Sequence, residues 1–281
     1  MHHHMHMTNH GQPTRRKLIR ALDTAATVGR WTAVRSVEQL ARGISTRPAI
    51  RSGRLPRPTG RPLVFVGGYG ASPELYDLFS RSFQAAGIDS VHVVPLLDNA
   101  FSDIHQNAEL VSHYIAGLGS DVDIVAHSEG GLISRAYLKY LGGTDHVRHL
   151  VTLGTPHRGL PRTIRHLPAT AEEATRRARE LASRHLVPIW EQVASAAVKQ
   201  MIAGSEFMTD LNADPASPGP TQYCAIASRH DGIIPFASAS LPDAANVANI
   251  TIDEGWVRGN HAAITTTNAT VFRTALEFLY R

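Results

Sequence analysis

Short apolar runs alternate with amphipathic segments along most of the chain. The runs at residues 63–66 and 122–126 are mostly apolar and are followed closely by glycine or serine, a pattern typical of strands buried on both faces. Between such runs, apolar residues recur at helical spacing, as in residues 103–117. The pattern predicts strands at 63–66, 90–94, 122–126, 149–153, 221–227 and 250–252, and helices at about 72–83, 103–117, 129–141 and 268–280.

This alternation predicts an α/β fold with a mainly parallel sheet, right-handed crossovers and helices on both faces. In such sheets, ligands and reacting groups gather beyond the carboxyl ends of the strands. Candidate chemistry is therefore expected in the loops that follow strands.

The segments outside this pattern predict a domain plan. Residues 1–13 are a histidine-rich tail or tag, and residues 14–61 combine an amphipathic helix at about 14–41 with a linker rich in Pro, Gly and Arg. The α/β domain is expected at 62–281, with a helical insertion at about 160–203 that includes a charged helix at 171–185. That insertion is interpreted either as a lid or cap over the carboxyl edge of the sheet, or as a packed helical hairpin that does not move.

Composition narrows the function classes. The chain has 281 residues, of which 43% are hydrophobic and 19% charged, and its net charge is +4. The basic excess lies before the α/β domain, where a solvated arm or weak contact with an anionic membrane surface is expected. Nucleic acid is not an expected partner because no aromatic residues alternate with these arginines. The single cysteine, Cys224, excludes an intrachain disulfide and suits a buried site. We find neither an apolar run near 18 residues nor an export signal, which favours a cytoplasmic location.

Ser128 is the candidate nucleophile. It lies between a buried strand and a predicted helix, in the sequence Ala126-His127-Ser128-Glu129-Gly130-Gly131. A sharp turn at Ser128 needs small residues two positions away on each side, and it would expose the hydroxyl beside a helix N-terminus. The alternative is a plain helix N-cap serine. The segment resembles the nucleophile elbow of α/β-hydrolases, in the bacterial lipase form with alanine as its first small residue.

That resemblance implies an acid and then a histidine, each on a loop after a late strand. Asp231 fits the acid and His261 fits the base, because each follows one of the last two predicted strands. His230 is a competing base and Asp253 an alternative acid, while His127 is expected to point away from the reaction.

Two backbone N–H groups should bind the negative oxygen of a tetrahedral intermediate. One belongs to Glu129, directly after the nucleophile, and the other to the glycine-rich loop at 67–70. The likeness to bacterial lipases assigns the second donor to Tyr69, although Gly67 stands where those enzymes carry histidine. A dinucleotide-binding interpretation of this loop fails because Pro73 occupies the place of the third glycine.

Two further segments, 152–159 and 204–212, look like those that precede and follow the lid in bacterial triacylglycerol lipases, so the likeness spans about 63–264. It implies a lipase or carboxylesterase that cleaves a small acyl ester or lipid through an acyl-enzyme on Ser128. Gly68, His157 and Trp256 are the predicted substrate-binding residues. No cofactor or metal is expected. An acyltransferase with the same residues, or a non-catalytic binding protein of this fold, stays open as an alternative.

Overall fold

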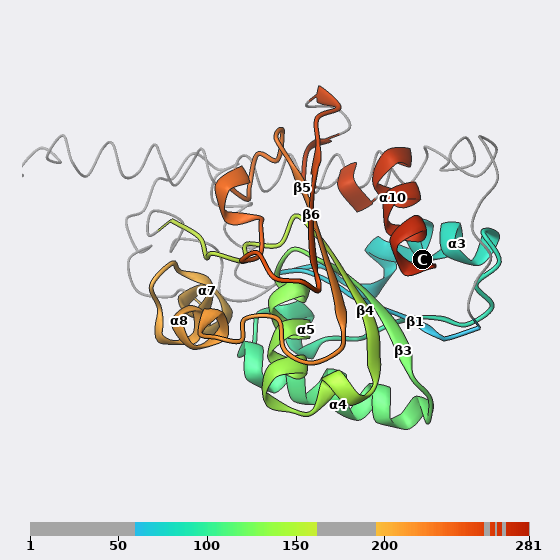
Figure 1. The fold of residues 1–281 in the computed structure, drawn as a ribbon, viewed down its shortest axis with the longest axis horizontal. Coiled ribbons are helices and arrows are strands. Elements are labelled where there is room, and N and C mark those ends of the chain that lie inside the picture. The colour runs from blue at the N-terminus through green and yellow to red at the C-terminus, as the bar shows by residue number, and fades with distance from the viewer. Residues whose placement is uncertain (1–59, 162–194, 256–258, 262, 266–267, 281) are drawn as a thin grey trace, which may run out of the picture.

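The computed structural model describes residues 60–161, 195–255, 259–261, 263–265 and 268–280. Within these ranges, strands alternate with helices as the sequence pattern predicts (Figure 1). The strands are β1 (Leu63–Val66), β2 (Val91–Val93), β3 (Val122–His127), β4 (Val147–Leu153), β5 (Gln222–Ser228) and β6 (Val247–Ile252). The α-helices are α3 (Asp77–Ala85), α4 (Ile104–Leu118), α5 (Glu129–Tyr140), α7 (Ala196–Met201), α8 (Glu206–Asn212) and α10 (Ala269–Leu279).

The strands form one parallel sheet in the order β2-β1-β3-β4-β5-β6. The prediction of a mainly parallel α/β sheet is confirmed. Because all strands point the same way, the loops after β1, β3, β5 and β6 open at one edge of the sheet. Those four loops carry the glycine-rich segment at 67–70, Ser128, Asp231 and His261, and the candidate His157 lies in the loop after β4.

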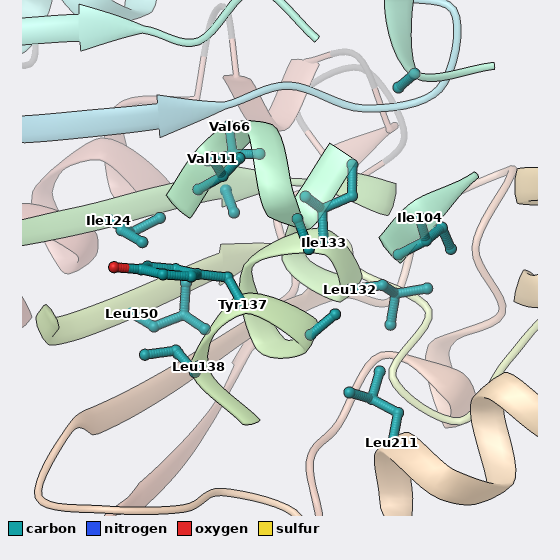
Figure 2. Packing of buried hydrophobic residues seen from close by; sticks show 14 of the residues in the cluster. Val66, Ile104, Val111, Ile124, Leu132, Ile133, Tyr137, Leu138, Leu150 and Leu211 are labelled. Carbon is teal, nitrogen blue, oxygen red and sulfur yellow. The ribbon is translucent and has the colours of Figure 1, made fainter. Parts of the chain in front are cut away.

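The apolar positions of the sheet divide between two cores. Val64, Ile124 and Leu150 belong to one core, which α4 and α5 cover, and Figure 2 shows Ile124, Leu150 and Tyr137 gathered in it. Phe65 and the strand residues that point the other way pack with α3 and α10. Because helices cover both faces of the sheet, the central strands have continuous apolar sequences instead of alternating apolar and polar residues.

The helix ends follow local sequence signals. Asp103 caps α4, its carboxylate accepting hydrogen bonds from the amides of His105 and Gln106, and Gly119 ends that helix in a left-handed conformation. Asn268 caps α10 through the amide of Val271. These ends lie within two residues of their predicted places.

Two elements differ by more than two residues from the predicted bounds. The predicted helix at 72–83 is a 3₁₀ turn at Pro73–Tyr76 followed by α3. Strand β6 begins at Val247, three residues before its predicted start. It is an edge strand and only partly buried, so its first half lacks a continuous apolar run. In that half, the Asn249 side chain exchanges two hydrogen bonds with the backbone of Leu241.

The chain leaves the sheet after β4 and returns at α7 along one short parallel pairing. Leu160 N–H donates to the carbonyl of Met201 at 2.7 Å, and Ala203 N–H donates to the carbonyl of Leu160 at 2.9 Å. The predicted charged helix at 171–185 lies outside the described residues, as do the tail, the helix at 14–41 and most of the linker. Arg61, the last arginine of that linker, forms an ion pair with buried Asp123. No helix in the described ranges combines the length and the apolar character that crossing a bilayer requires.

Candidate active site

Ser128 occupies a strained turn between β3 and α5. Its backbone has φ 55° and ψ −125°, a conformation that non-glycine residues rarely adopt, and it is 8% exposed. Its hydroxyl makes no capping hydrogen bond to α5, so the plain N-cap interpretation does not describe this serine. The strain is held by buried contacts, because Ser128 N–H donates to the carbonyl of Leu153 and its own carbonyl accepts from Thr155 Oγ1 at 2.7 Å.

The turn is tight because α5 begins against the backbone of β1. A Cβ atom added to Gly130 would lie 2.3 Å from the carbonyl oxygen of Val66. Only glycine fits there, and on the strand side Ala126 is fully buried. The small residues that the sequence places around Ser128 are therefore required by the packing of the helix on the sheet.

Asp231 and His261 come together from the loops after β5 and β6. His261 Nδ1 lies 2.7 Å from Asp231 Oδ2, and the two side chains are 7% and 2% exposed. The other carboxylate oxygen, Oδ1, accepts hydrogen bonds from the amides of Ile233 and Ile234. With both oxygens engaged, the carboxylate is fixed, and an imidazole that donates from Nδ1 keeps Nε2 as a base.

The two alternatives in the sequence pair with each other. His230 Nε2 lies 2.7 Å from Asp253 Oδ1, on side chains that are 36% and 61% exposed. Arg229 adds a longer ion pair to the same carboxylate. Asp253 is therefore engaged at the surface with His230, while Asp231 and His261 form a buried pair.

The glycine-rich loop after β1 lies directly over the serine. A Cβ atom on Gly68 would be 2.7 Å from Ser128 Cβ and 3.4 Å from its Oγ. Gly68 N–H donates to the hydroxyl of Tyr76 at 2.8 Å, so this amide is already engaged. The next amide along the loop belongs to Tyr69, whose hydroxyl lies 3.0 Å from Ser195 Oγ. The structure thus brings Tyr69 and the nucleophile into the same small region.

A left-handed turn supports the far side of this loop. Gly70 N–H donates to the carbonyl of Asn99 at 2.8 Å. Asp98, Asn99 and Ala100 have φ of 45°, 51° and 66° in succession, which costs about 1–2 kcal/mol per residue. The hydrogen bonds at Gly68 and Gly70 hold the backbone on both sides of Tyr69, so the direction of the intervening amide is set by the fold.

Glu129 follows the nucleophile and is completely buried. Among the residues that the structure describes, neither carboxylate oxygen has a hydrogen-bond partner. Burial raises the pKa of Glu129 well above its ordinary value, because the charged form is poorly solvated there. A neutral carboxyl group beside Ser128 adds no negative charge where an oxyanion would form.

Two of the three predicted substrate-binding residues lie in the part of the chain that the structure describes, and of these Gly68 lies against the serine. His157 is fully buried, with Nε2 2.8 Å from Thr152 Oγ1 and its carbonyl accepting a hydrogen bond from Asn212. Its role in substrate binding stays a prediction. Trp256 lies outside the described residues.

Several neighbours of the site were not predicted from the sequence. Tyr76 reaches both Gly68 and His127 with its hydroxyl, and Thr155 holds the carbonyl of Ser128. Gly154, after β4, lies so close to the buried pair that an added Cβ would be 2.9 Å from Asp231 Oδ2. Among the residues described, no group of three or more His, Cys, Asp or Glu side chains is placed to hold a metal ion. Gly154 and Thr155 lie in the Thr-Leu-Gly-Thr-Pro-His segment, whose likeness to bacterial lipases could have indicated them as site residues. No sequence motif around Tyr76 indicates that it belongs to the site.

About half of the chain, including Ser128, is similar to a known protein family. The model of a family described as palmitoyl protein thioesterase matches residues 90–228, a stretch that contains Ser128 but ends before Asp231 and His261. A search of the curated proteins found no match.

Solved structures of lipases are similar in fold. Lipase B of Aspergillus fumigatus has a TM-score of 0.62 and 18% identity, over 82% of this chain and 55% of its own length, so the chain spans about half of that protein. The mature Bacillus licheniformis lipase has a TM-score of 0.58 and 20% identity, over 80% of this chain and 94% of its own. The Paleococcus ferrophilus monoacylglycerol lipase has a TM-score of 0.54 and 15% identity, over 81% of this chain and 99% of its own. By its parallel sheet, its strained serine turn and these similarities, the chain has the α/β-hydrolase fold.

Proposed function

We propose that this chain is a serine hydrolase that cleaves acyl esters through a covalent acyl-enzyme on Ser128. Two observations support the proposal: the strained, buried serine at the end of β3, and the buried His261–Asp231 pair from the loops after β5 and β6. The ring of His261 lies 4.5 Å, between centroids, from that of His127, the residue before the serine. The match to a thioesterase family and the fold shared with three lipases support the same reaction class.

In the first half of the reaction, Ser128 Oγ adds to the acyl carbon while its proton passes to His261 Nε2. Asp231 holds the imidazole in the required tautomer and stabilises its charged form. The amides of Tyr69 and Glu129 bind the negative oxygen of the tetrahedral intermediate. When that intermediate collapses, the alcohol leaves with the proton from His261.

Water then repeats the sequence on the acyl-enzyme. His261 takes a proton from the water as its oxygen adds to the acyl carbon, and returns a proton to Ser128 Oγ as the carboxylic acid leaves. An alcohol in place of water would give acyl transfer with the same residues. Analysis of the products with and without an added alcohol distinguishes the two outcomes.

The test is Ser128→Ala, assayed on nitrophenyl esters together with labelling of the wild-type protein by a fluorophosphonate probe. We expect loss of at least about a thousandfold in kcat/KM and of all labelling at residue 128. Ser80→Ala is the matched control, because Ser80 lies on α3 and its hydroxyl donates to the carbonyl of Asp77 within the same turn. Retained activity in Ser128→Ala, or a label mapped to another residue, would refute the assignment.

A second candidate substrate is a long-chain acyl thioester, which the thioesterase family match favours. The mechanism is unchanged, except that a thiol leaves in place of the alcohol. Pairs of oxygen esters and thioesters with butanoyl, octanoyl and hexadecanoyl chains compare the two classes directly. Higher kcat/KM for the hexadecanoyl thioester than for its ester would favour the thioesterase function, and the reverse would favour the esterase.

A further inference from the structure

His127, the residue before the nucleophile, connects two loops of the site through a continuous chain of hydrogen bonds. Gly68 N–H donates to Tyr76 Oη at 2.8 Å, Tyr76 Oη lies 3.1 Å from His127 Nδ1, and His127 Nε2 lies 3.1 Å from the carbonyl oxygen of His261. The first group belongs to the loop after β1 and the last to the loop after β6. Tyr76 and His127 thus link the two loops.

The two ends of the chain fix the direction of its outer hydrogen bonds, and the protonation of His127 decides the one between them. The carbonyl of His261 can only accept, so Nε2 of His127 carries a proton and donates. At the other end the amide of Gly68 can only donate, so Tyr76 Oη accepts from it. When His127 is neutral, its Nδ1 is an acceptor and Tyr76 Oη donates to it. A neutral His127 with an unprotonated Nδ1 completes the chain without a conflict.

Burial agrees with this assignment. Tyr76 is 3% exposed and His127 is 4% exposed. Burial, with a smaller contribution from the neighbouring His261 charge, keeps the pKa of His127 well below its ordinary value. The His127 and His261 rings are 4.5 Å apart between centroids, so a neutral His127 also avoids repulsion when His261 takes a proton.

We propose that Tyr76 and His127 are positioning residues that hold the Tyr69 amide and the His261 imidazole in register around Ser128. Gly68 directly precedes Tyr69. The chain of hydrogen bonds from Gly68 through Tyr76 and His127, called the relay below, ends on the backbone of His261 itself. A shift at either end is therefore transmitted to the donor of the oxyanion site or to the base. The proposal deepens the proposed function and rests on it for its kinetic part.

The test is Tyr76→Phe, which removes the hydroxyl and keeps the ring that packs 4.6 Å from Phe65. We expect kcat on a nitrophenyl ester to fall about tenfold to hundredfold with KM nearly unchanged, because a misplaced donor affects the transition state more than substrate binding. Tyr223→Phe is the matched control. Tyr223 is equally buried and also donates one hydrogen bond, to the carbonyl of Pro218, so this variant should lose stability and keep kcat.

Amide hydrogen exchange provides a readout that does not depend on hydrolysis. In Tyr76→Phe the amide of Gly68 should lose protection, while the amide of Gly70, which bonds to the carbonyl of Asn99, should keep it. His127→Asn keeps an acceptor near the Nδ1 position and is too short to reach the carbonyl of His261. It should therefore lower kcat and leave the Gly68 amide protected.

The possible results separate the two proposals. Wild-type protein that neither hydrolyses esters nor reacts with a fluorophosphonate would refute the proposed function, and the exchange of Gly68 would still decide whether the relay exists. An active wild type with unchanged kcat and unchanged Gly68 exchange in Tyr76→Phe would overturn the relay. Equal kinetic losses in Tyr76→Phe and Tyr223→Phe would overturn it as well, because they would indicate only a general effect of a lost buried hydroxyl.

Discussion

Gly68→Ala tests how closely the loop after β1 must approach the nucleophile. The added methyl group would lie 2.7 Å from Ser128 Cβ and 3.0 Å from the carbonyl oxygen of His127. Ordinary contact begins near 3.4 Å, so either the loop or the serine must retreat by at least 0.7 Å. His127 ends the central strand β3 and is buried, so the loop is the part that moves.

A retreat of this size would carry the Tyr69 amide, the proposed donor, away from the oxyanion of the tetrahedral intermediate. A hydrogen bond near 2.9 Å would lengthen to about 3.6 Å, where it contributes little. Loss of one such donor typically lowers kcat about a hundredfold to a thousandfold, or about 2.7–4 kcal/mol of transition-state stabilisation. Overpacking should also cost about 1–3 kcal/mol in the free energy of unfolding.

Steady-state kinetics on a nitrophenyl ester and urea unfolding measure these two losses. Gly117→Ala makes the same chemical change on α4, where the added Cβ meets nothing within 4 Å. It should leave kcat/KM unchanged and raise the free energy of unfolding by about 0.5–1 kcal/mol. A Gly68→Ala variant that folds and keeps kcat/KM within about threefold of wild type would refute the reasoning, since one lost oxyanion donor costs far more.

Three further outcomes are expected. Asp231→Asn should keep the fold and lower kcat by about 10⁴-fold, because an amide cannot hold His261 in the required tautomer. Steady-state kinetics measure the loss and circular dichroism checks the fold, and a folded variant that loses less than about tenfold in kcat would contradict this. Because burial raises the pKa of Glu129 in the folded state, the wild-type protein loses stability as pH rises above about 4.5, the ordinary pKa of the group. Urea unfolding should find Glu129→Gln more stable than wild type at pH 8, by a larger margin than at pH 5. An equal margin at the two pH values would contradict this. His157 has a lowered pKa because it is buried and, to a smaller extent, because it lies near Arg135, so as pH falls below about 6.5 the unfolded chain binds the proton first and the folded state loses stability. Between pH 7 and 5, the melting temperature of His157→Gln should therefore fall less steeply with pH than that of the wild type. Identical slopes would contradict the assignment.

The sequence by itself determined the sheet and the order of the candidate residues. Apolar runs mark strands covered on both faces, and glycine or serine at their ends marks the loops, because both signals depend on residues close together in the chain. Ser128, Asp231 and His261 could therefore be placed after their strands. The bounds of β6 were missed because an edge strand with polar contacts has no continuous apolar run.

The pairing of side chains across the site was decided only by the tertiary structure. Local sequence offered two acids and two histidines after the last strands, and packing joined Asp231 to His261 and left Asp253 with His230. Tyr76 meets His127 from 51 positions away, and His127 meets the carbonyl of His261 from 134 positions away. Such contacts depend on how helices and loops pack on the sheet, which periodicity in a short segment does not encode.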